Sequence, residues 1–182
     1  MFAYSGSKMK YRKHFDAAHV KVQVKKVHTY IEAFAGTLSS LFHNLENISA
    51  ERIIINDINI SLINLYRQIK SNPNEVIETF KVLETTFQEN VPSEFEGQRI
   101  IKDKELREEK LGHLRDFYHQ ARDYFNKKEN TPQNAGVMIF MLNHNFNGLY
   151  DEAKKTGNFN IAFNWNVRKI NIMTIVDNIN NL

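Results

Sequence analysis

The sequence predicts an α/β fold that starts as a parallel sheet and continues as a helical insertion. Within about the first 70 residues, strand and helix patterns alternate, as is typical of parallel sheets. Helical patterns dominate the rest of the chain. Because a parallel sheet needs more than two strands, we expect the sheet to be incomplete within these residues.

The spacing of apolar residues predicts the early elements. A short basic helix is expected over residues 8–18, and a strand over 28–34. A helix is expected over 36–47, with Leu38, Leu41, Phe42 and Leu45 at helical spacing. Three consecutive isoleucines in residues 52–56 predict a short, fully buried strand.

The later segments read mainly as helices. Two of them, 62–70 and 75–86, are separated by Ser71-Asn72-Pro73. A long polar helix is expected over 102–128, with Leu106, Leu114, Phe117, Ala121 and Phe125 on one side. Further elements are an apolar helix over 135–142, a hairpin over 150–163 around Gly157, and a helix over 170–182.

The composition is that of an ordinary globular domain, with 182 residues, 42% of them apolar and 25% charged. The absence of cysteine excludes disulfides and thiolate chemistry, and it is compatible with the cytoplasmic location that we expect. The sequence has neither a signal-peptide pattern nor the run of about 20 apolar residues that spans a bilayer.

The net charge is a modest +3, but its distribution is uneven. Residues 1–28 hold seven Lys or Arg and a single acid, Asp16. A basic edge of this kind can meet phosphate groups. A solvated surface helix explains the same charge equally well.

A first candidate site is the segment from Tyr30 to Thr37. A strand ends beside Glu32, and a small-residue turn through Gly36 opens a helix. Nucleotide-like ligands bind at this edge of open α/β sheets, where helix N–H groups are free. A single glycine does not make a dinucleotide fingerprint. A plain strand-to-helix turn explains the pattern equally well.

A second candidate is Asp57, directly after the second strand. An acid at this position is well placed to accept hydrogen bonds from ribose hydroxyls. Asp and Asn also cap helices, and Asn59 precedes the helix that begins near Leu62. Ligand binding and helix capping are equally good explanations of Asp57.

A third candidate runs from Leu142 to Asn160, where aromatic residues alternate with amides, next to Lys154 and Lys155. Rings can stack on bases, amides can bond to base edges, and lysines can hold phosphates. A polar hairpin with a few aromatic residues is the more frequent explanation. His144 lies in this segment and is expected to be a polar surface residue, since the histidines lack metal-ligand spacing.

Taken together, these segments resemble the Dam-like family of S-adenosylmethionine-dependent, adenine-specific DNA methyltransferases. The likeness spans residues 2 to about 165. The matching motifs are Phe2-Ala3-Tyr4-Ser5-Gly6-Ser7-Lys8, Glu32-Ala33-Phe34-Ala35-Gly36, Asn56-Asp57-Ile58-Asn59, Phe146-Asn147-Gly148-Leu149-Tyr150 and Gly157-Asn158-Phe159-Asn160.

The resemblance implies a Rossmann-like sheet of the class I methyltransferases with a helical target-recognition insertion. It implies an S-adenosylmethionine-binding part over 1–70, a target-recognition region over 71–165, and the start of a return to the catalytic half over 166–182. The implied cofactor contacts are Tyr4, Lys8, Glu32, Phe34, Gly36 and Asp57. The implied contacts with double-stranded DNA are Phe146, Asn147, Lys154 and Lys155.

The sequence departs from the family pattern in four places. Ala33 replaces a proline, Leu38 replaces a common second glycine, and Asp151 stands where some members carry a base-reading arginine. No Pro-Pro pair occurs, so the catalytic Asp-Pro-Pro-Tyr motif is absent.

We therefore expect the N-terminal part of a truncated or split methyltransferase. It would be inactive alone, with a complementary C-terminal half or a second copy as its partner. The alternative is a non-catalytic DNA-binding remnant.

Overall fold

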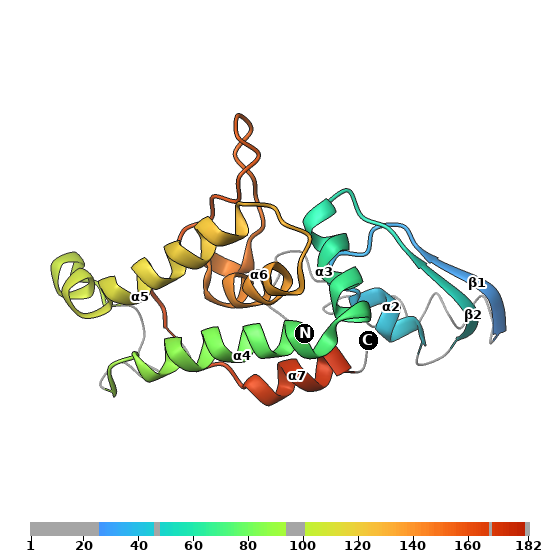
Figure 1. Ribbon diagram of the computed structural model, residues 1–182, viewed down its shortest axis with the longest axis horizontal. Coiled ribbons are helices and arrows are strands. Elements are labelled where there is room, and N and C mark those ends of the chain that lie inside the picture. Colours follow the sequence, from blue (N-terminus) through green and yellow to red (C-terminus); the bar gives the residue numbers. More distant parts are fainter. Residues whose placement is uncertain (1–25, 46–47, 94–100, 168, 181–182) are drawn as a thin grey trace. The chain divides into compact units, whose positions relative to one another are not determined.

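A computed structural model of the chain describes residues 26–45, 48–93, 101–167 and 169–180. The predicted basic helix over 8–18 and the predicted cofactor residues Tyr4 and Lys8 lie outside these residues. The described residues form two compact units, the first ending at Ile63 and the second starting at Asn64 (Figure 1). In these ranges, no helix has the length and apolar character needed to cross a membrane.

The first unit is a two-stranded parallel sheet with a helix between its strands. Strand β1 (Lys26–Glu32) pairs with β2 (Ser49–Ile55), and the register runs from Lys26 opposite Ser49 to Glu32 opposite Ile55. Helix α2 (Ser39–Leu45) connects the two strands. The predicted strands and their parallel pairing are confirmed.

The prediction of a fully buried second strand is wrong. No residue of β2 is fully buried, and Ile53 is 44% exposed. On β1, Ile31 is 62% exposed. Among the described residues β2 pairs with β1 alone, so the sheet lacks the neighbouring strands and the second covering layer that bury such side chains in complete parallel sheets.

The turn after β1 delays the helix that follows it. Gly36 has φ of +48° and Leu38 has φ of +58°, so α2 begins at Ser39 and not at residue 36 as predicted. A left-handed backbone costs a residue with a side chain about 1–2 kcal/mol. The left-handed backbone explains why glycine suits this position. Leu38 adopts the same conformation, and its side chain is buried.

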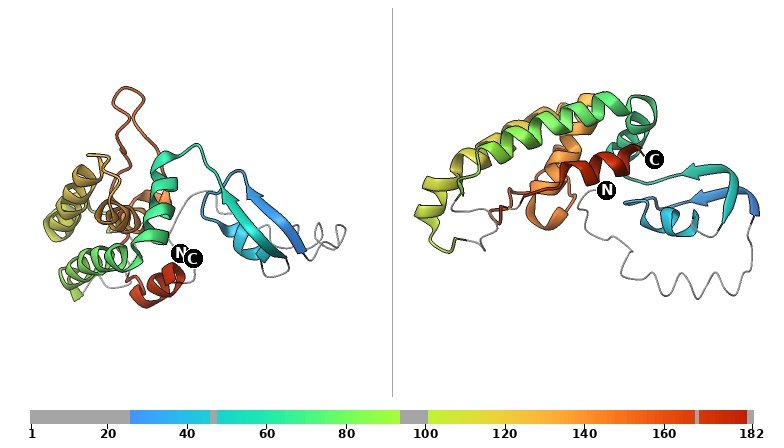
Figure 2. Two further views of the ribbon diagram at one scale, coloured as in Figure 1. Left: turned by 45° about the vertical axis from the view of Figure 1, so that its right-hand side comes forward. Right: turned by 90° about the horizontal axis from the view of Figure 1, so that it is seen from below.

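The second unit consists of helices that match the predicted segments (Figure 2). Helix α3 begins in the first unit and ends in the second. The elements are α3 (Ile60–Ser71), α4 (Pro73–Glu89), α5 (Lys104–Phe125), α6 (Pro132–His144), the short 3-10 helix η3 (Phe146–Gly148) and α7 (Ile172–Asn180).

Helix α6 lies at the centre of the second unit. Its residues from Asn134 to His144 are all buried, and α4 and α5 both pack on it, while α7 packs on α4. The apolar side of α5 is as predicted at its C-terminal end, where Ala121 and Phe125 are buried. At the other end Leu106 is 42% exposed and is not part of the core.

The crossing of α4 and α6 depends on Gly136. A Cβ atom at this position would lie 2.7 Å from Cβ of Thr79 and 2.8 Å from the carbonyl oxygen of Val76. Both atoms belong to α4, and neither is the end of a flexible side chain. The two helices can therefore approach this closely only with glycine at residue 136.

We expect Gly136→Ala to lower the free energy of unfolding by about 1–3 kcal/mol, the usual penalty for an overpacked core. Thermal or urea denaturation measures this loss. Gly112→Ala in α5 is the matched control, because its Cβ would meet only the side chain of Glu108. Alanine also favours a helix over glycine by about 1 kcal/mol. Equal losses in both variants would contradict the proposed close contact.

Candidate cofactor turn and nucleic-acid-binding loop

The carboxylate of Asp57 joins the ends of the two strands. Its Oδ2 accepts a hydrogen bond from the backbone N–H of Gly36 at 2.9 Å. Its Oδ1 accepts another from the N–H of Asn59, also at 2.9 Å. One side chain therefore holds both the turn after β1 and the turn after β2.

Backbone hydrogen bonds reinforce this connection. The N–H of Asn56 donates to the carbonyl of Glu32 at 2.8 Å, and the N–H of Ala35 donates to the carbonyl of Asn56 at 2.8 Å. The Asn56 side chain also donates to the carbonyl of Ala33 at 3.1 Å. The parallel pairing thus continues past the strands and sets the two predicted motifs side by side.

The structure brings together three of the predicted cofactor residues, Glu32, Gly36 and Asp57. Phe34 lies in the same turn and points its ring into solvent, with 86% of its surface exposed. The sequence left ligand binding and helix capping as explanations of Asp57. The residue that caps α3 is Asn59, whose Oδ1 accepts from the N–H of Leu62 at the start of that helix. Asp57 orders the turn ahead of that cap.

Glu32 is engaged with its own strand. The Tyr30 hydroxyl donates to Oε2 of Glu32 at 3.0 Å, and the Asn44 amide donates to the Tyr30 oxygen. Burial raises the pKa of Tyr30, and the neighbouring Glu32 carboxylate raises it further. Tyr30 therefore stays a neutral donor, and Glu32 keeps its other oxygen available.

Phe146 and Asn147 form an exposed corner directly after α6. Phe146 is 53% exposed, and Asn147 and Gly148 have φ of +56° and +61°. Two successive left-handed residues turn the chain sharply, and Asn and Gly tolerate this best. The amide of Asn145 closes the corner by donating to the carbonyl of Leu149 at 2.6 Å.

A hairpin-like loop follows this corner, and two antiparallel bridges connect its two sides. Phe163 pairs antiparallel with Asn145, and Glu152 pairs antiparallel with Phe159. The chain turns back as predicted, but these are isolated bridges and not regular strands. Figure 1 shows the loop projecting beyond the helices of its own unit. Lys154 and Lys155 are exposed near its turn.

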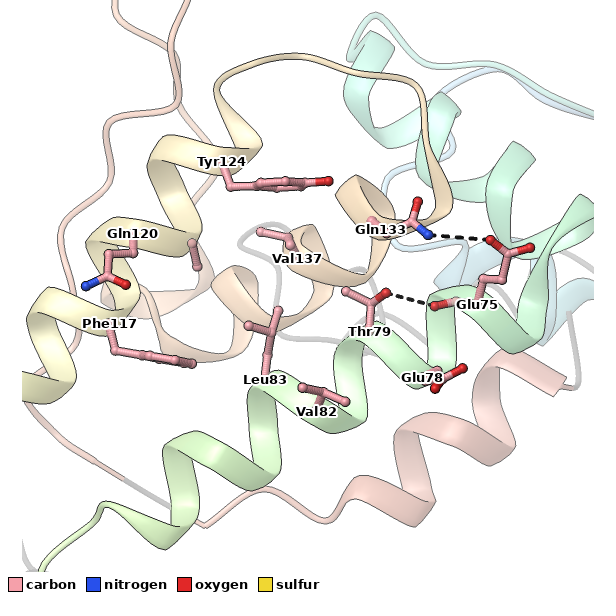
Figure 3. Close-up of a pocket in the computed structure, with 11 residues that line it drawn as sticks. Glu75, Glu78, Thr79, Val82, Leu83, Phe117, Gln120, Tyr124, Gln133 and Val137 are labelled. Atoms are coloured by element: carbon pink, nitrogen blue, oxygen red, sulfur yellow. Dashed lines mark hydrogen bonds between the residues drawn. The ribbon is translucent and has the colours of Figure 1, made fainter.

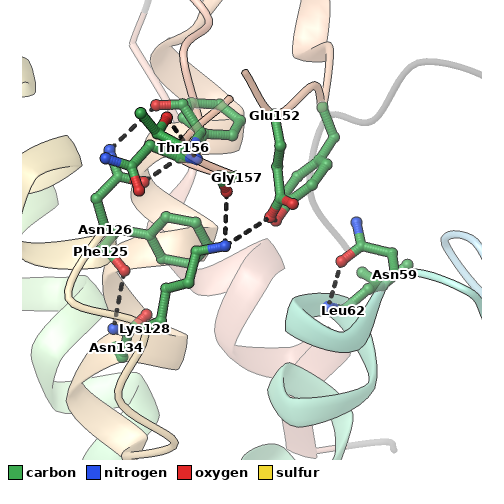
Figure 4. A network of polar contacts seen from close by, with 12 residues as sticks. Asn59, Leu62, Phe125, Asn126, Lys128, Asn134, Glu152, Thr156 and Gly157 are labelled. Atoms are coloured by element: carbon green, nitrogen blue, oxygen red, sulfur yellow. Dashed lines mark hydrogen bonds and ion pairs between the residues drawn. The ribbon is translucent and has the colours of Figure 1, made fainter. Parts of the chain in front are cut away.

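Residues that follow α5 anchor this loop from below (Figure 4). Oδ1 of Asn126 accepts from the N–H of Phe159 at 2.8 Å, and its amide donates to the Phe159 carbonyl at 3.1 Å. Lys128 donates to the carbonyl of Gly157 at 2.6 Å and pairs with Glu152 at 3.7 Å. These anchors lie about 30 residues from their partners along the chain, and no local pattern predicted them.

Two further side chains of α5 shape the base of the loop. The buried Tyr118 donates to the carbonyl of Ile161 at 2.9 Å, and burial strongly raises its pKa. Burial lowers the pKa of the neighbouring His119, and Arg122 and Arg115 lower it further. His119 is therefore less easily protonated than an ordinary histidine.

His144 is not a polar surface residue as the sequence suggested. It is the last residue of α6, is 3% exposed, and places Nε2 2.7 Å from Oε2 of Glu84 on α4. Glu84 is fully buried. Sequence reasoning missed Glu84, because 60 residues separate it from its partner.

The second unit also carries a groove between α4 and α5 (Figure 3), with a volume of about 570 Å³. Val137 of α6 forms part of its floor, and Phe117 and Leu83 line it from α5 and α4. Its remaining lining residues are Glu75, Glu78, Thr79, Val82, Gln120, Ala121, Tyr124 and Gln133. Of the predicted cofactor and DNA residues that the structure describes, none lines this groove.

Comparison with known proteins places this arrangement in a family. Residues 4–177 match the D12 class of N6 adenine-specific DNA methyltransferases. The chain is 31% identical over 137 residues to the type II methyltransferase M.MjaIII of Methanocaldococcus jannaschii, a match that covers 74% of this chain and 40% of that protein.

A second relative is the type II methyltransferase M1.LlaDCHI of Lactococcus lactis subsp. cremoris. It is 29% identical over 139 residues, which cover 76% of this chain and 39% of the relative. The chain thus spans about two fifths of the length of the curated relatives that it matches. The resemblance seen in the sequence motifs is confirmed, and the chain belongs to the D12 class of N6 adenine-specific DNA methyltransferases.

Proposed function

We propose that this chain supplies the cofactor-binding turn and the target-recognition loop of an enzyme that methylates adenine in duplex DNA. The methyl group would pass from the sulfonium of S-adenosylmethionine to the amino nitrogen of adenine. The observation that carries the proposal is the hydrogen bond from Gly36 to Asp57. It joins the two family motifs at the carboxyl ends of parallel strands, where such folds bind nucleotide-like ligands.

Asp57 suits the ribose of the cofactor. Each oxygen of an ionised carboxylate can accept more than one hydrogen bond, so the two backbone donors leave acceptor capacity for two hydroxyl groups. The exposed ring of Phe34 offers an apolar surface in the same turn. We propose that Glu32, Gly36, Tyr4 and Lys8 complete the cofactor contacts, as the family motifs imply.

The corner after α6 suits DNA. The exposed ring of Phe146 can stack on a base or enter between base pairs, and the Asn147 side chain can bond to a base edge. Lys154 and Lys155 can hold phosphates from the projecting loop. Separate contacts with bases and with phosphates suit an enzyme that turns its target base out of the duplex, which costs a few kcal/mol.

Methyl transfer also needs acceptors that orient the adenine amino group, and the resemblance assigns these to an Asp-Pro-Pro-Tyr motif. The present sequence contains no Pro-Pro pair. We propose that another polypeptide segment supplies the motif and packs on the exposed sides of β1 and β2. Ile31 and Ile53, which the register places on opposite faces of the sheet, are both accessible, whereas strands of complete parallel sheets are covered on both faces.

The cofactor site predicts that the chain binds S-adenosylmethionine saturably and that Asp57→Ala weakens this binding tenfold or more. Each hydrogen bond to a charged group contributes about 1.5–3 kcal/mol, and the variant loses two. Isothermal titration calorimetry measures the affinity. Asp123→Ala on α5 is the control for loss of an exposed acid. Cofactor affinity unchanged by Asp57→Ala would contradict the site.

The loop predicts salt-dependent binding to duplex DNA that Lys154→Ala/Lys155→Ala weakens. Each phosphate contact adds about 0.9 to the slope of log affinity against log salt, so the slope should fall by about two. Gel shifts across a salt series measure it, with Lys70→Ala/Lys81→Ala as the matched control. Binding to DNA without any binding of cofactor would favour the non-catalytic remnant instead.

The proposed second segment predicts no methyl transfer by this chain alone and restored transfer in its presence. The assay follows labelled methyl groups from S-adenosylmethionine into duplex DNA. The chain is tested alone and then mixed with a second polypeptide, expressed from a neighbouring coding segment, that carries the acceptor motif. Ile31→Lys should reduce the restored activity, because it puts a charge on the covered face. Robust methylation by the chain alone would refute this part of the proposal.

A further inference from the structure

Glu84 and His144 form a buried hydrogen-bonded pair inside the second unit. The distance between Oε2 of Glu84 and Nε2 of His144 is 2.7 Å, and both side chains are almost completely buried. The His144 ring lies against Phe87 and Phe140, with centroid distances of 4.0 and 4.7 Å. The pair is therefore enclosed by aromatic rings, in surroundings of low polarity.

Gln88 completes the polar network. Its amide donates to Oε1 of Glu84 at 2.6 Å and to the carbonyl of Ile170 at 2.9 Å. Both oxygens of Glu84 thus have partners, as a buried carboxylate requires. The network connects α4, the end of α6 and the segment that leads into α7.

Stability alone does not explain such a pair. Buried polar groups lose their hydration, and apolar side chains of similar size often stabilise a protein equally well. A buried hydrogen-bonded pair does, however, restrict geometry, because only one arrangement of the helices satisfies both partners. The pair therefore fixes the position of the end of α6 relative to α4.

The exposed corner that carries Phe146 directly follows the end of α6. The carbonyl of His144 accepts from the N–H of Asn164 at 2.8 Å, and the N–H of Phe146 donates to the carbonyl of Ala162 at 2.9 Å. The pair thus holds the last residue of α6 on one side, while these bonds hold it to the returning strand of the loop. Only Asn145 stands between the buried His144 ring and the exposed Phe146 ring.

We propose that Glu84 and His144 are positioning residues for DNA recognition. By fixing the end of α6, they set the direction in which Phe146 and Asn147 leave the helix. Contacts with phosphates tolerate a shift of the loop, whereas contacts with base edges do not. The pair therefore controls sequence preference more than overall affinity. This inference rests on the proposed binding of DNA by the loop.

The test compares two variants that change the pair in different ways. Glu84→Leu/His144→Phe replaces both polar partners with apolar groups and should leave the melting temperature nearly unchanged. Glu84→Gln keeps hydrogen bonds to both His144 and Gln88 and is the conservative control. Each protein is used to select bound sequences from duplexes with a randomised centre. Affinity is then measured for the selected and the unselected pools.

We expect the wild type and Glu84→Gln to prefer the selected pool. The double variant should bind the unselected pool as before but lose about tenfold or more of that preference, the usual effect of losing a base contact. Gln88→Leu, which loosens the network without removing the pair, should lose part of it. This variant still tests the inference if the double variant does not fold.

Three results would overturn the inference. In the first, the double variant keeps both its stability and the full preference. In the second, the wild type binds duplexes without any preference, so there is no base contact to position. In the third, the double variant fails to fold and Gln88→Leu leaves the preference intact. If the wild type binds no duplex at all, the proposed function itself fails, which is a different outcome from these three.

Discussion

Helix α6 is buried from Asn134 to His144, so each polar group in this stretch must find a partner within the protein. At its start, the Thr131 hydroxyl accepts from the N–H of Asn134, and the Asn134 amide donates to the carbonyl of Phe125. At its end, His144 meets the carboxylate of Glu84. The close approach at Gly136 sets how α4 reaches these groups. These contacts of α6 therefore set the position of the loop that follows it.

The strand-end turn obeys the same requirement in the first unit. Backbone N–H groups that leave a strand need acceptors, and the Asp57 carboxylate serves two of them. Leu38 accepts a left-handed backbone so that α2 can start close to the sheet. The result is an acid held at the carboxyl end of two parallel strands with acceptor capacity to spare, which is the chemistry that a ribose needs.

The two candidate sites differ in how they are held. The cofactor turn is fixed by neighbours in the sheet, through the continuing parallel pairing of Glu32, Ala35 and Asn56. The proposed DNA loop is fixed from a distance, through Asn126 and Lys128 at its base and through the buried pair behind its corner. The proposed contact with the bases and phosphates of a duplex requires an exposed tip on an ordered base, and this arrangement provides both.

The sequence by itself determined the elements and the family. Periodic apolar residues located both strands and the helices, and Asn59 was recognisable as a cap because capping acts over three residues. The motifs around Gly36, Asp57 and Phe146 placed the chain among adenine methyltransferases, as the comparisons confirm.

Only the tertiary structure decided which groups are buried. Three isoleucines in a row fit a covered strand, yet Ile53 is exposed because the described sheet has no second neighbour for β2. His144 stands among polar residues, yet it is buried against Glu84, 60 residues earlier in the chain. Local patterns report the preference of a segment, but burial and pairing depend on what packs against it, and that information lies in distant residues.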